Sequence, residues 1–487
     1  MKLQVLFLFL VSLILHGCKV GPDYVSPVVF VPESYVEDQP CETEVVEDED
    51  LVHWWSTFND PFLDELLETA IDENFDYKIA LEQVYQARSQ YWIQFTQLLP
   101  EFDASATGSH YKISESFVTS PAATAAAAGT ISPVQNFYQV SLAAIWELDL
   151  FGKFRRSADA SYDLWEATVD EMRGVKIMVI SQVAEIYATI CSFQQQRDIA
   201  MQVLAVDEEL LALAVVRCEA GLADLQEVEL ATAQQEADLA QLHVIESALK
   251  QSIYSLAVLL GCLPETLPVE FEEIRPIPQA YGKVPVGLPS ELIRRRPDIQ
   301  AAERQLASAT EMIGVAVANL FPSVSLTGSS SSFASNPLQG ANVGFSSDDI
   351  KKLFLPASLI WGIGATAVAP VFDFGKRFAA IDVQISLRNQ AYYAYQKTVI
   401  LAFQEVEQTL QAYFNEEVRQ QALQRQLQAN GRVLELTTDL FQAGLAAYTQ
   451  VLDAKEVWLA SLNAATQSQQ ALTADLIAIY TALGGDW

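Results

Sequence analysis

The chain has 487 residues, of which 51% are hydrophobic, and it carries a formal net charge of −33. So acidic a chain excludes nucleic acid as a partner, because phosphate recognition needs a basic face. Much of the excess lies in residues 20–77, which hold 17 Asp or Glu and no Lys or Arg. We expect the part from 18 to 59 to be an extended acidic segment, because its charges repel one another.

The first 18 residues predict a cleaved signal that ends at a lipidated cysteine. Lys2 precedes an apolar core from Val5 to Leu15, and Gly17 precedes Cys18. At ~11 residues the core is shorter than the ~20 needed to span a bilayer, so residues 1–17 are interpreted as a lipoprotein signal peptide. Cys18 would then carry the acyl chains that anchor the protein. The alternative is an ordinary signal with a chance cysteine, because His16 is unusual in this position.

The other cysteines give no sign of a disulfide framework or a metal site. Cys41, Cys191, Cys218 and Cys262 are scattered, and no pair has metal-ligand spacing. We therefore expect free thiols.

Motifs recur along the chain at one spacing, which predicts two copies of one plan. Residues 151–153 (FGK) recur at 374–376, and residues 220–223 (AGLA) recur at 443–446, both at an offset of 223. We expect a first repeat at 60–261 and a second at 290–487. A proline-rich linker, 262–289, joins them.

Each repeat begins with a helix and continues with strands. The helices are predicted at 63–98 and 290–320, and Pro100 and Pro322 end them. Apolar and polar residues then alternate, which predicts strands at about 101–113 and 137–150 in the first repeat. The second repeat has its strands at about 323–333 and 357–373, joined by a loop rich in Ser, Asn and Gly.

Two very long helices and two shorter return helices follow the strands. Residues 152–217 and 375–440 lack proline and show heptad-like apolar spacing, which suits coiled-coil packing. At ~1.5 Å per residue each would reach ~100 Å. After the glycine of each AGLA turn, return helices are predicted at 224–260 and 447–482.

Four alternating strands would fit part of an outer-membrane β-barrel wall but cannot close one. An open edge in lipid leaves backbone groups unpaired, so several copies must share one barrel. Two copies give eight strands and a filled bore, whereas three give twelve strands and an open channel. The alternative is a soluble hairpin that decorates a coiled coil.

Six motifs lie along the mature chain: 20–24 (VGPDY), 54–55 (WW), 58–61 (FNDP), 287–299 (GLPSELIRRRPDI), 301–303 (AAE) and 321–328 (FPSVSLTG). Together they resemble the TolC-like outer-membrane efflux protein family, in its lipoprotein branch that serves resistance-nodulation-division pumps. The resemblance covers nearly the whole mature chain.

The resemblance implies an α+β membrane protein that forms a homotrimer in the outer membrane. Its twelve-stranded β-barrel would continue into a periplasmic α-helical barrel. The tunnel would dock on a periplasmic adaptor that connects it to an inner-membrane resistance-nodulation-division pump. Drugs and other small toxic compounds would pass outward unchanged. The alternative within the family is a type I secretion duct for proteins.

The resemblance also assigns roles to the two turns between long helices. Gly221, Leu222, Gly444 and Leu445 would be the tips that dock the adaptor, although the glycines could serve only as helix terminators. Asp453, in the segment VLDA, resembles the family's aperture acid, and three copies would form a ring that binds cations. The other predicted aperture residues are Thr449, which stands where many relatives carry a large apolar residue, and Asp224, Glu227 and Glu229. Alternatively, these acids are simply solvated.

The sequence offers no catalytic constellation. His53, His110 and His243 lie in unrelated contexts, and no phosphate-binding GxxxxGK[ST] motif is present. We therefore expect no enzyme activity, no metal, and no cofactor other than the lipid on Cys18.

Overall fold

A computed structural model describes most of the chain, in two compact units. The described residues are 18–29, 31–32, 35–36, 43–44, 53–112, 134–222, 224–266, 271, 273–279, 284–285, 289–326 and 341–485. Residues 1–17 and Cys41 therefore lie outside the described residues. Unit 1 comprises 1–27, 85–166 and 303–393, and unit 2 comprises 28–84, 167–302 and 394–487. Each unit takes segments from both repeats.

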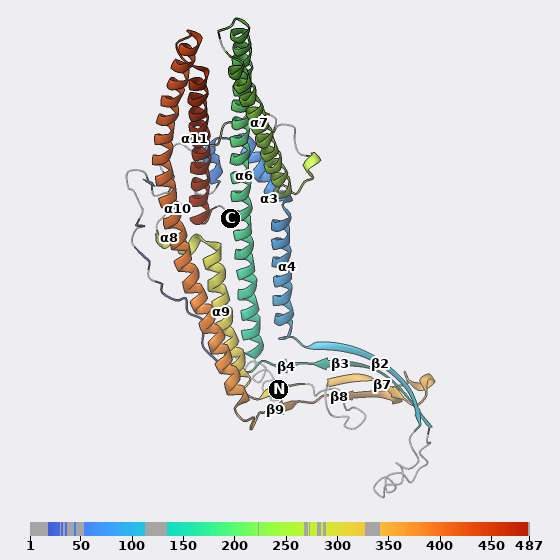
Figure 1. The fold of residues 1–487 in the computed structure, drawn as a ribbon. Coiled ribbons are helices and arrows are strands. Elements are labelled where there is room, and N and C mark those ends of the chain that lie inside the picture. Colours follow the sequence, from blue (N-terminus) through green and yellow to red (C-terminus); the bar gives the residue numbers. More distant parts are fainter. Residues whose placement is uncertain are drawn as a thin grey trace. The chain divides into compact units, whose positions relative to one another are not determined.

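The long helices and their return helices have the same lengths in the two repeats. The long helices α6 (Lys153–Glu219) and α10 (Lys376–Gln442) each have 67 residues. The return helices α7 (Leu225–Leu259) and α11 (Tyr448–Ala482) each have 35 residues. In unit 2, α7 runs back beside α6 and α11 beside α10 (Figure 1). The predicted helices are confirmed to within two residues.

The helix that opens each repeat is broken in two, which corrects the predictions of single helices at 63–98 and 290–320. In the first repeat, α3 (Pro61–Glu73) and α4 (Phe75–Thr96) meet at Asn74. Asn74 has an extended backbone, and its side chain accepts from the Tyr77 N–H at 3.0 Å. In the second repeat, α8 (Pro289–Arg295) and α9 (Pro297–Ala318) are separated because a residue before proline disfavours helical geometry.

Unit 1 contains a four-stranded antiparallel sheet (Figure 1). Its order is β2 (Glu101–Lys112), β3 (Val134–Ile145), β7 (Ala341–Ser347) and β8 (Leu359–Gly362). A smaller sheet orders β4 (Glu147–Leu148), β6 (Ser323–Ser325) and β9 (Thr366–Val368). In unit 2, β1 (Thr43–Glu44) pairs with β5 (Val284–Pro285) in parallel. The pairing of β3 with β7 joins the two repeats into one sheet.

Three strand predictions need correction. The segment expected at 137–150 is interrupted at Trp146, whose indole N–H donates to the Leu98 carbonyl at 2.9 Å. The segment expected at 357–373 is divided between β8 and β9, which lie in different sheets. The strand expected at 323–333 ends at Ser325, and residues 327–333 lie outside the described residues. Residues 341–347, expected as loop, form β7 because Val343 and Phe345 alternate with small and polar residues.

The core of unit 2 contains the aromatic motif near residue 54. The Trp54 ring stacks on Tyr480, with centroids 4.9 Å apart. Asp60 caps α3 by accepting from the Phe62 N–H at 3.0 Å, and it also accepts from the Tyr187 hydroxyl at 2.5 Å. The motif is therefore part of the fold of unit 2. Among the described residues, no helix is both long and apolar enough to cross a membrane.

Candidate functional site

The predicted tips are two exposed turns with the same construction. Gly221 has φ +69° and Gly444 has φ +76°, a region that glycine adopts without strain. The Leu222 N–H donates to the Arg217 carbonyl at 2.9 Å, and the Leu445 N–H donates to the Leu440 carbonyl at 2.8 Å. The side chains of Leu222 and Leu445 are 74% and 76% exposed. Each turn therefore presents a leucine beside a glycine.

There is space beside both glycines. A Cβ placed on Gly221 or Gly444 would meet no described heavy atom within 4 Å outside the adjoining residues. Another helix could therefore approach the backbone closely at either turn.

The five predicted aperture residues have three different environments. Asp224 caps α7 by accepting from the Glu227 N–H at 3.3 Å. Glu227 is partly buried and pairs with Arg217, whose Nε lies 3.3 Å away, so its charge is compensated within the protomer. Glu229, Thr449 and Asp453 are exposed. Asp453 and Glu229 are therefore the exposed acids of this group that neither cap α7 nor pair with Arg217.

The two turns share a small core in unit 2. The guanidinium of Arg217 lies over the Phe441 ring, with its carbon 4.7 Å from the centroid. Phe441 in turn contacts Tyr448, with ring centroids 5.5 Å apart. The core consists of Leu210, Ala214, Ala231, Phe441, Tyr448 and Val451. The two turns are thus joined by direct packing through this core.

A buried ion cluster next to this core was missed in the sequence. The Lys455 ammonium pairs with Asp238, 2.8 Å away, and with Asp207. The side chains of Lys455 and Asp207 are 4% and 1% exposed. These three residues, the Lys455 cluster, come from α11, α7 and α6. The sequence did contain a signal for Lys455. Asp453 was predicted to be exposed, and residues two apart face different sides of a helix, so Lys455 would face away from the exposed side.

The environment of the Lys455 cluster shifts the pKa values of its acids in opposite directions. Burial raises the pKa of Asp207 to about 6. Burial opposes ionisation of Asp238 too and is the largest single effect, but the hydrogen bonds with Lys455, Asp207 and Gln234 and the charge of Lys455 together outweigh it and lower the pKa of Asp238. The cluster therefore carries one net negative charge at neutral pH, and it becomes neutral when Asp207 takes up a proton.

The comparison with known families decides the identity of the chain. The family model described as outer membrane efflux protein matches residues 66–262 and 288–485. The chain belongs to the outer membrane efflux protein family. The model thus matches the chain twice, once in each half.

Individual relatives of this outer membrane efflux protein span nearly its whole length. Nodulation protein T of Rhizobium leguminosarum bv. viciae is 29% identical over 97% of this chain and 92% of its own. The cation efflux system protein CusC of Escherichia coli O6:H1 is 28% identical over 98% of each chain. The solved outer-membrane channel OprN is similar in fold, with a TM-score of 0.84 and 28% identity over 96% of this chain and 100% of its own.

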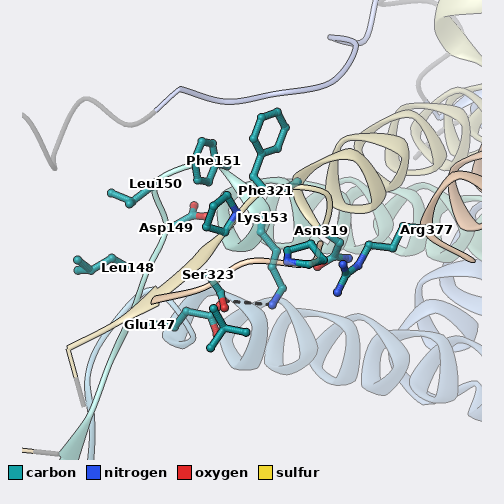
Figure 2. A pocket seen from close by; sticks show the side chains of 14 residues that line it. Glu147, Leu148, Asp149, Leu150, Phe151, Lys153, Asn319, Phe321, Ser323 and Arg377 are labelled. Carbon is teal, nitrogen blue, oxygen red and sulfur yellow. Dashed lines mark hydrogen bonds and ion pairs between the residues drawn. The ribbon is translucent and has the colours of Figure 1, made fainter. Parts of the chain in front are cut away.

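Members of this family are passive outer-membrane channels, so this efflux protein is a channel component and not an enzyme. A pocket of about 210 Å³ in unit 1 illustrates the chemistry available (Figure 2). Lys153 Nζ lies 3.4 Å from Glu147 Oε1, and Asp149 accepts from the Arg155 N–H and Nε at 3.0 Å each. Its charged groups form ion pairs that hold the start of α6. In the described part of the chain, no three potential metal-ligating side chains cluster.

The thiols of the efflux protein are free in the part of the chain that the structure describes. Cys18 is exposed, Cys191 is buried, and Cys218 and Cys262 are partly exposed. Burial raises the pKa of the Cys191 thiol to about 12, so this thiol is protonated and unreactive at neutral pH.

Proposed function

We propose that this outer-membrane efflux channel is a homotrimer in a tripartite system that exports small toxic molecules. A periplasmic adaptor would dock on the tips at Gly221 and Gly444 and connect the channel to an inner-membrane resistance-nodulation-division pump. The names of relatives support this choice over a protein-secretion duct, because they describe a cation efflux system and a solvent efflux pump. Cys18 would carry the lipid anchor in the outer membrane.

The single observation that carries the barrel proposal is one row of the four-stranded sheet. Ala104, Leu142, Val343 and Trp361 lie opposite one another across β2, β3, β7 and β8, and all four are apolar. The next row contains Ser105, Ser141, Gly344 and Ile360, and the hydroxyl oxygens of the two serines are 3.0 Å apart. The row after it on the same face contains Thr107, Gln139 and Ser346. One face thus suits lipid and the other suits water, as in the wall of a membrane barrel.

The free edges of this sheet support a shared barrel. Within the described strands, β2 and β8 each pair on one side only. In hydrocarbon such edges cost several kcal/mol per unpaired group, so neighbouring copies would supply the missing partners. Three copies of four strands would give twelve and leave an open bore.

Apolar side chains on α4 and α10 also support assembly. On α4, Trp92 and Ile93 are 58% and 60% exposed, and on α10, Phe378 and Tyr393 are 64% and 66% exposed. Exposed apolar surface of this kind is typical of protein–protein contacts. Neighbouring copies would cover it in a trimer.

The channel proposal is tested with purified protein in planar bilayers. We expect a trimer by native mass spectrometry and stepwise ion conductance from the same preparation. In cells, deletion of the gene should raise sensitivity to some members of a panel of drugs, dyes, metals and detergents. A stable monomer that does not conduct would contradict the proposal.

Replacing Asp453 with alanine should widen the proposed aperture and remove its ring of negative charge. Loss of a ring of carboxylates changes both the passage of ions and their selectivity. We expect single-channel conductance to rise by a factor on the order of two, together with greater sensitivity of cells to large antibiotics. Glu68→Ala, on the exposed surface of α3, removes a carboxylate far along the chain from both turns and should change neither. Unchanged conductance and sensitivity in Asp453→Ala would remove this residue from the aperture.

Replacing Cys18 with serine should abolish lipid attachment. Serine has no thiol to form the bond to the lipid, so metabolically supplied palmitate should no longer label the protein. A matched Cys218→Ser variant should be labelled like the parent. Persistent labelling of Cys18→Ser would contradict the assignment of the lipid to this residue.

A further inference from the structure

Within unit 1, the residues directly after Cys18 are held against α6 and α9 by one fully buried arginine. The Arg156 side chain in α6 is 0% exposed. Its Nε donates to the Val20 carbonyl at 3.0 Å, and its Nη2 donates to the Gly21 carbonyl at 3.2 Å and to Asp23 Oδ1 at 2.8 Å. Its Nη1 donates to Glu311 Oε2 at 2.8 Å. Three of the four partners therefore belong to the N-terminal segment.

Arg156 and the segment depend on each other energetically. A buried guanidinium is tolerated only when its donors are satisfied and its charge is paired. Without the segment, Arg156 would keep Glu311 alone and lose its other three acceptors. The segment in turn gains a second ionic contact, because Lys19 Nζ lies 2.6 Å from Asp159 Oδ2 and 3.2 Å from Glu311 Oε2.

Glycines allow the segment to approach the helices this closely. Gly21 has φ +92°, and a Cβ on it would lie 2.5 Å from the Cα of Gly314. A Cβ on Gly314 would lie 2.7 Å from Cδ and Nε of Arg156. A Cβ on Gly152 would lie 2.9 Å from the Cα of Lys19. A side chain at any of the three would displace backbone or the arginine.

The second repeat lacks this arrangement, so the arrangement is not part of the plan that the two repeats share. At the offset of 223, Arg156 corresponds to Ala379 and Gly152 corresponds to Gly375. Gly375 also has a positive φ, of +85°, but a Cβ on it would meet no described heavy atom within 4 Å outside the adjoining residues. The positive φ of the turn favours glycine in both repeats, whereas the close approach of Lys19 and the arginine are found only in the repeat that receives the N-terminal segment.

We propose that Arg156 is a positioning residue for the lipid anchor, fixing residues 19–23 so that Cys18 lies at the start of α6. The Val20 N–H donates to the Phe151 carbonyl at 3.2 Å, in the turn between β4 and α6. Phe151 itself stacks on Phe321, with centroids 4.6 Å apart (Figure 2). The acyl chains thus enter the bilayer at one place beside the sheet. This inference rests on the proposed lipidation of Cys18.

Trypsin cleavage after Lys19 provides an assay for this contact. Lys19 is the only Lys or Arg between Cys18 and Lys78, so trypsin cleavage after Lys19 separates the acylated end from the rest of the protein. In the native, membrane-extracted protein we expect slow cleavage, because a docked backbone does not fit a protease. In Arg156→Lys the charge opposite Glu311 remains, but the planar fork that reaches three acceptors is lost. We expect the fragment beginning at Val20 to form at least about tenfold faster.

Two further variants keep the test decisive. Gly21→Ala changes no helix, yet it should accelerate cleavage similarly, because it combines a strained φ with a clash against Gly314. Arg304→Lys is the matched control, because Arg304 is half-exposed on α9 and its ion pair with Asp163 is long, with 3.9 Å between Nη1 and Oδ1. It should be cleaved at the parental rate, and all variants should keep the parental gel mobility before digestion.

The outcomes separate the inference from the function on which it rests. Mass spectrometry of the released end shows whether Cys18 is acylated, and an unmodified cysteine would overturn the lipidation and not the docking. If neither Arg156→Lys nor Gly21→Ala accelerates cleavage, Arg156 does not hold the segment. Cleavage of the parent as fast as that of the denatured chain would overturn the docking itself.

Discussion

Alanine at Gly344 should separate the two repeats within the sheet, whereas alanine at Gly108 in the same sheet should be tolerated. A Cβ on Gly344 in β7 would lie 2.3 Å from the Val140 carbonyl oxygen and 2.7 Å from the Cα of Ser141 in β3. Both are backbone atoms, so the strands themselves must move apart. A Cβ on Gly108 would meet only the Tyr138 ring at 3.6 Å, an ordinary contact.

We expect Gly344→Ala to lower the free energy of unfolding by about 1–3 kcal/mol, the usual cost of overpacking. The cost should appear in the four-stranded sheet, because the pairing of β3 with β7 joins the repeats there. The measurement is the temperature at which the detergent-solubilised protein loses its compact gel mobility. Gly344→Ala should lose it several degrees earlier than the parent, and Gly108→Ala within about one degree. Equal effects of the two alanines would mean that β3 and β7 are not in contact in the membrane.

Much of the helical architecture could be predicted because its signals are long. The absence of proline over 152–217, followed by Gly221, defined α6 and its end within two residues. The breaks at Asn74 and Pro297 were missed for different reasons. Pro297 is a local helix-breaking signal, but the periodic apolar pattern over 290–320 favoured one continuous helix. Asn74 breaks its helix through a contact distant in sequence, because its side-chain amide donates to the Leu259 carbonyl at 2.8 Å.

The strands were harder to predict because pairing decides them. Residues 341–347 contain Asn, Gly and Ser and match a loop in composition, yet Val343 and Phe345 are held between β3 and β8. Conversely, the apolar pattern over 357–373 does not reveal that β9 leaves the large sheet to pair with β6. Register between distant strands is a tertiary property, so a single sequence indicates it only weakly.

At the tips, the sequence identified the turns and the exposed Asp453 but not what lies behind them. Glu227 was grouped with the aperture acids because neighbouring residues share a segment. Its partner Arg217 precedes the turn and comes close only when α7 folds back on α6. For the same reason the three members of the Lys455 cluster, on three helices, were not recognised together.

Replacing Lys455 with methionine should destabilise the tip strongly at neutral pH and much less in acid. The change leaves Asp207 and Asp238 buried together without a cation, and removal of one partner from a buried ion pair typically costs about 3–5 kcal/mol. Melting followed by circular dichroism, and hydrogen exchange in α11, should both report the loss. Lys397→Met, on the exposed surface of α10, should melt like the parent.

The pH dependence follows from the pKa of Asp207, which is raised from 3.8 to about 6 in the folded protein. An acid whose pKa is raised on folding binds its proton more tightly in the folded state. Its favourable contribution to the free energy of unfolding is therefore complete below pH 3.8 and is lost as the pH rises through about 6. The parent should therefore gain a little stability between pH 7.5 and 5. Without the opposing ammonium, Lys455→Met should gain more over the same interval, because protonation removes the repulsion between the two acids.

Adding Asp207→Asn to Lys455→Met distinguishes charge from packing. With one carboxylate left, repulsion disappears, so the double variant should recover part of the stability at pH 7.5 and lose most of its pH dependence. Tyr448, Glu227 and Arg217 also lie near this part of unit 2, but the pKa of Tyr448 is raised to about 12 and Glu227 is paired with Arg217. Neither tyrosine ionisation nor a free carboxylate there would imitate the effect. If Lys455→Met melts like the parent at both pH values, the buried cluster does not hold α11 against α6 and α7.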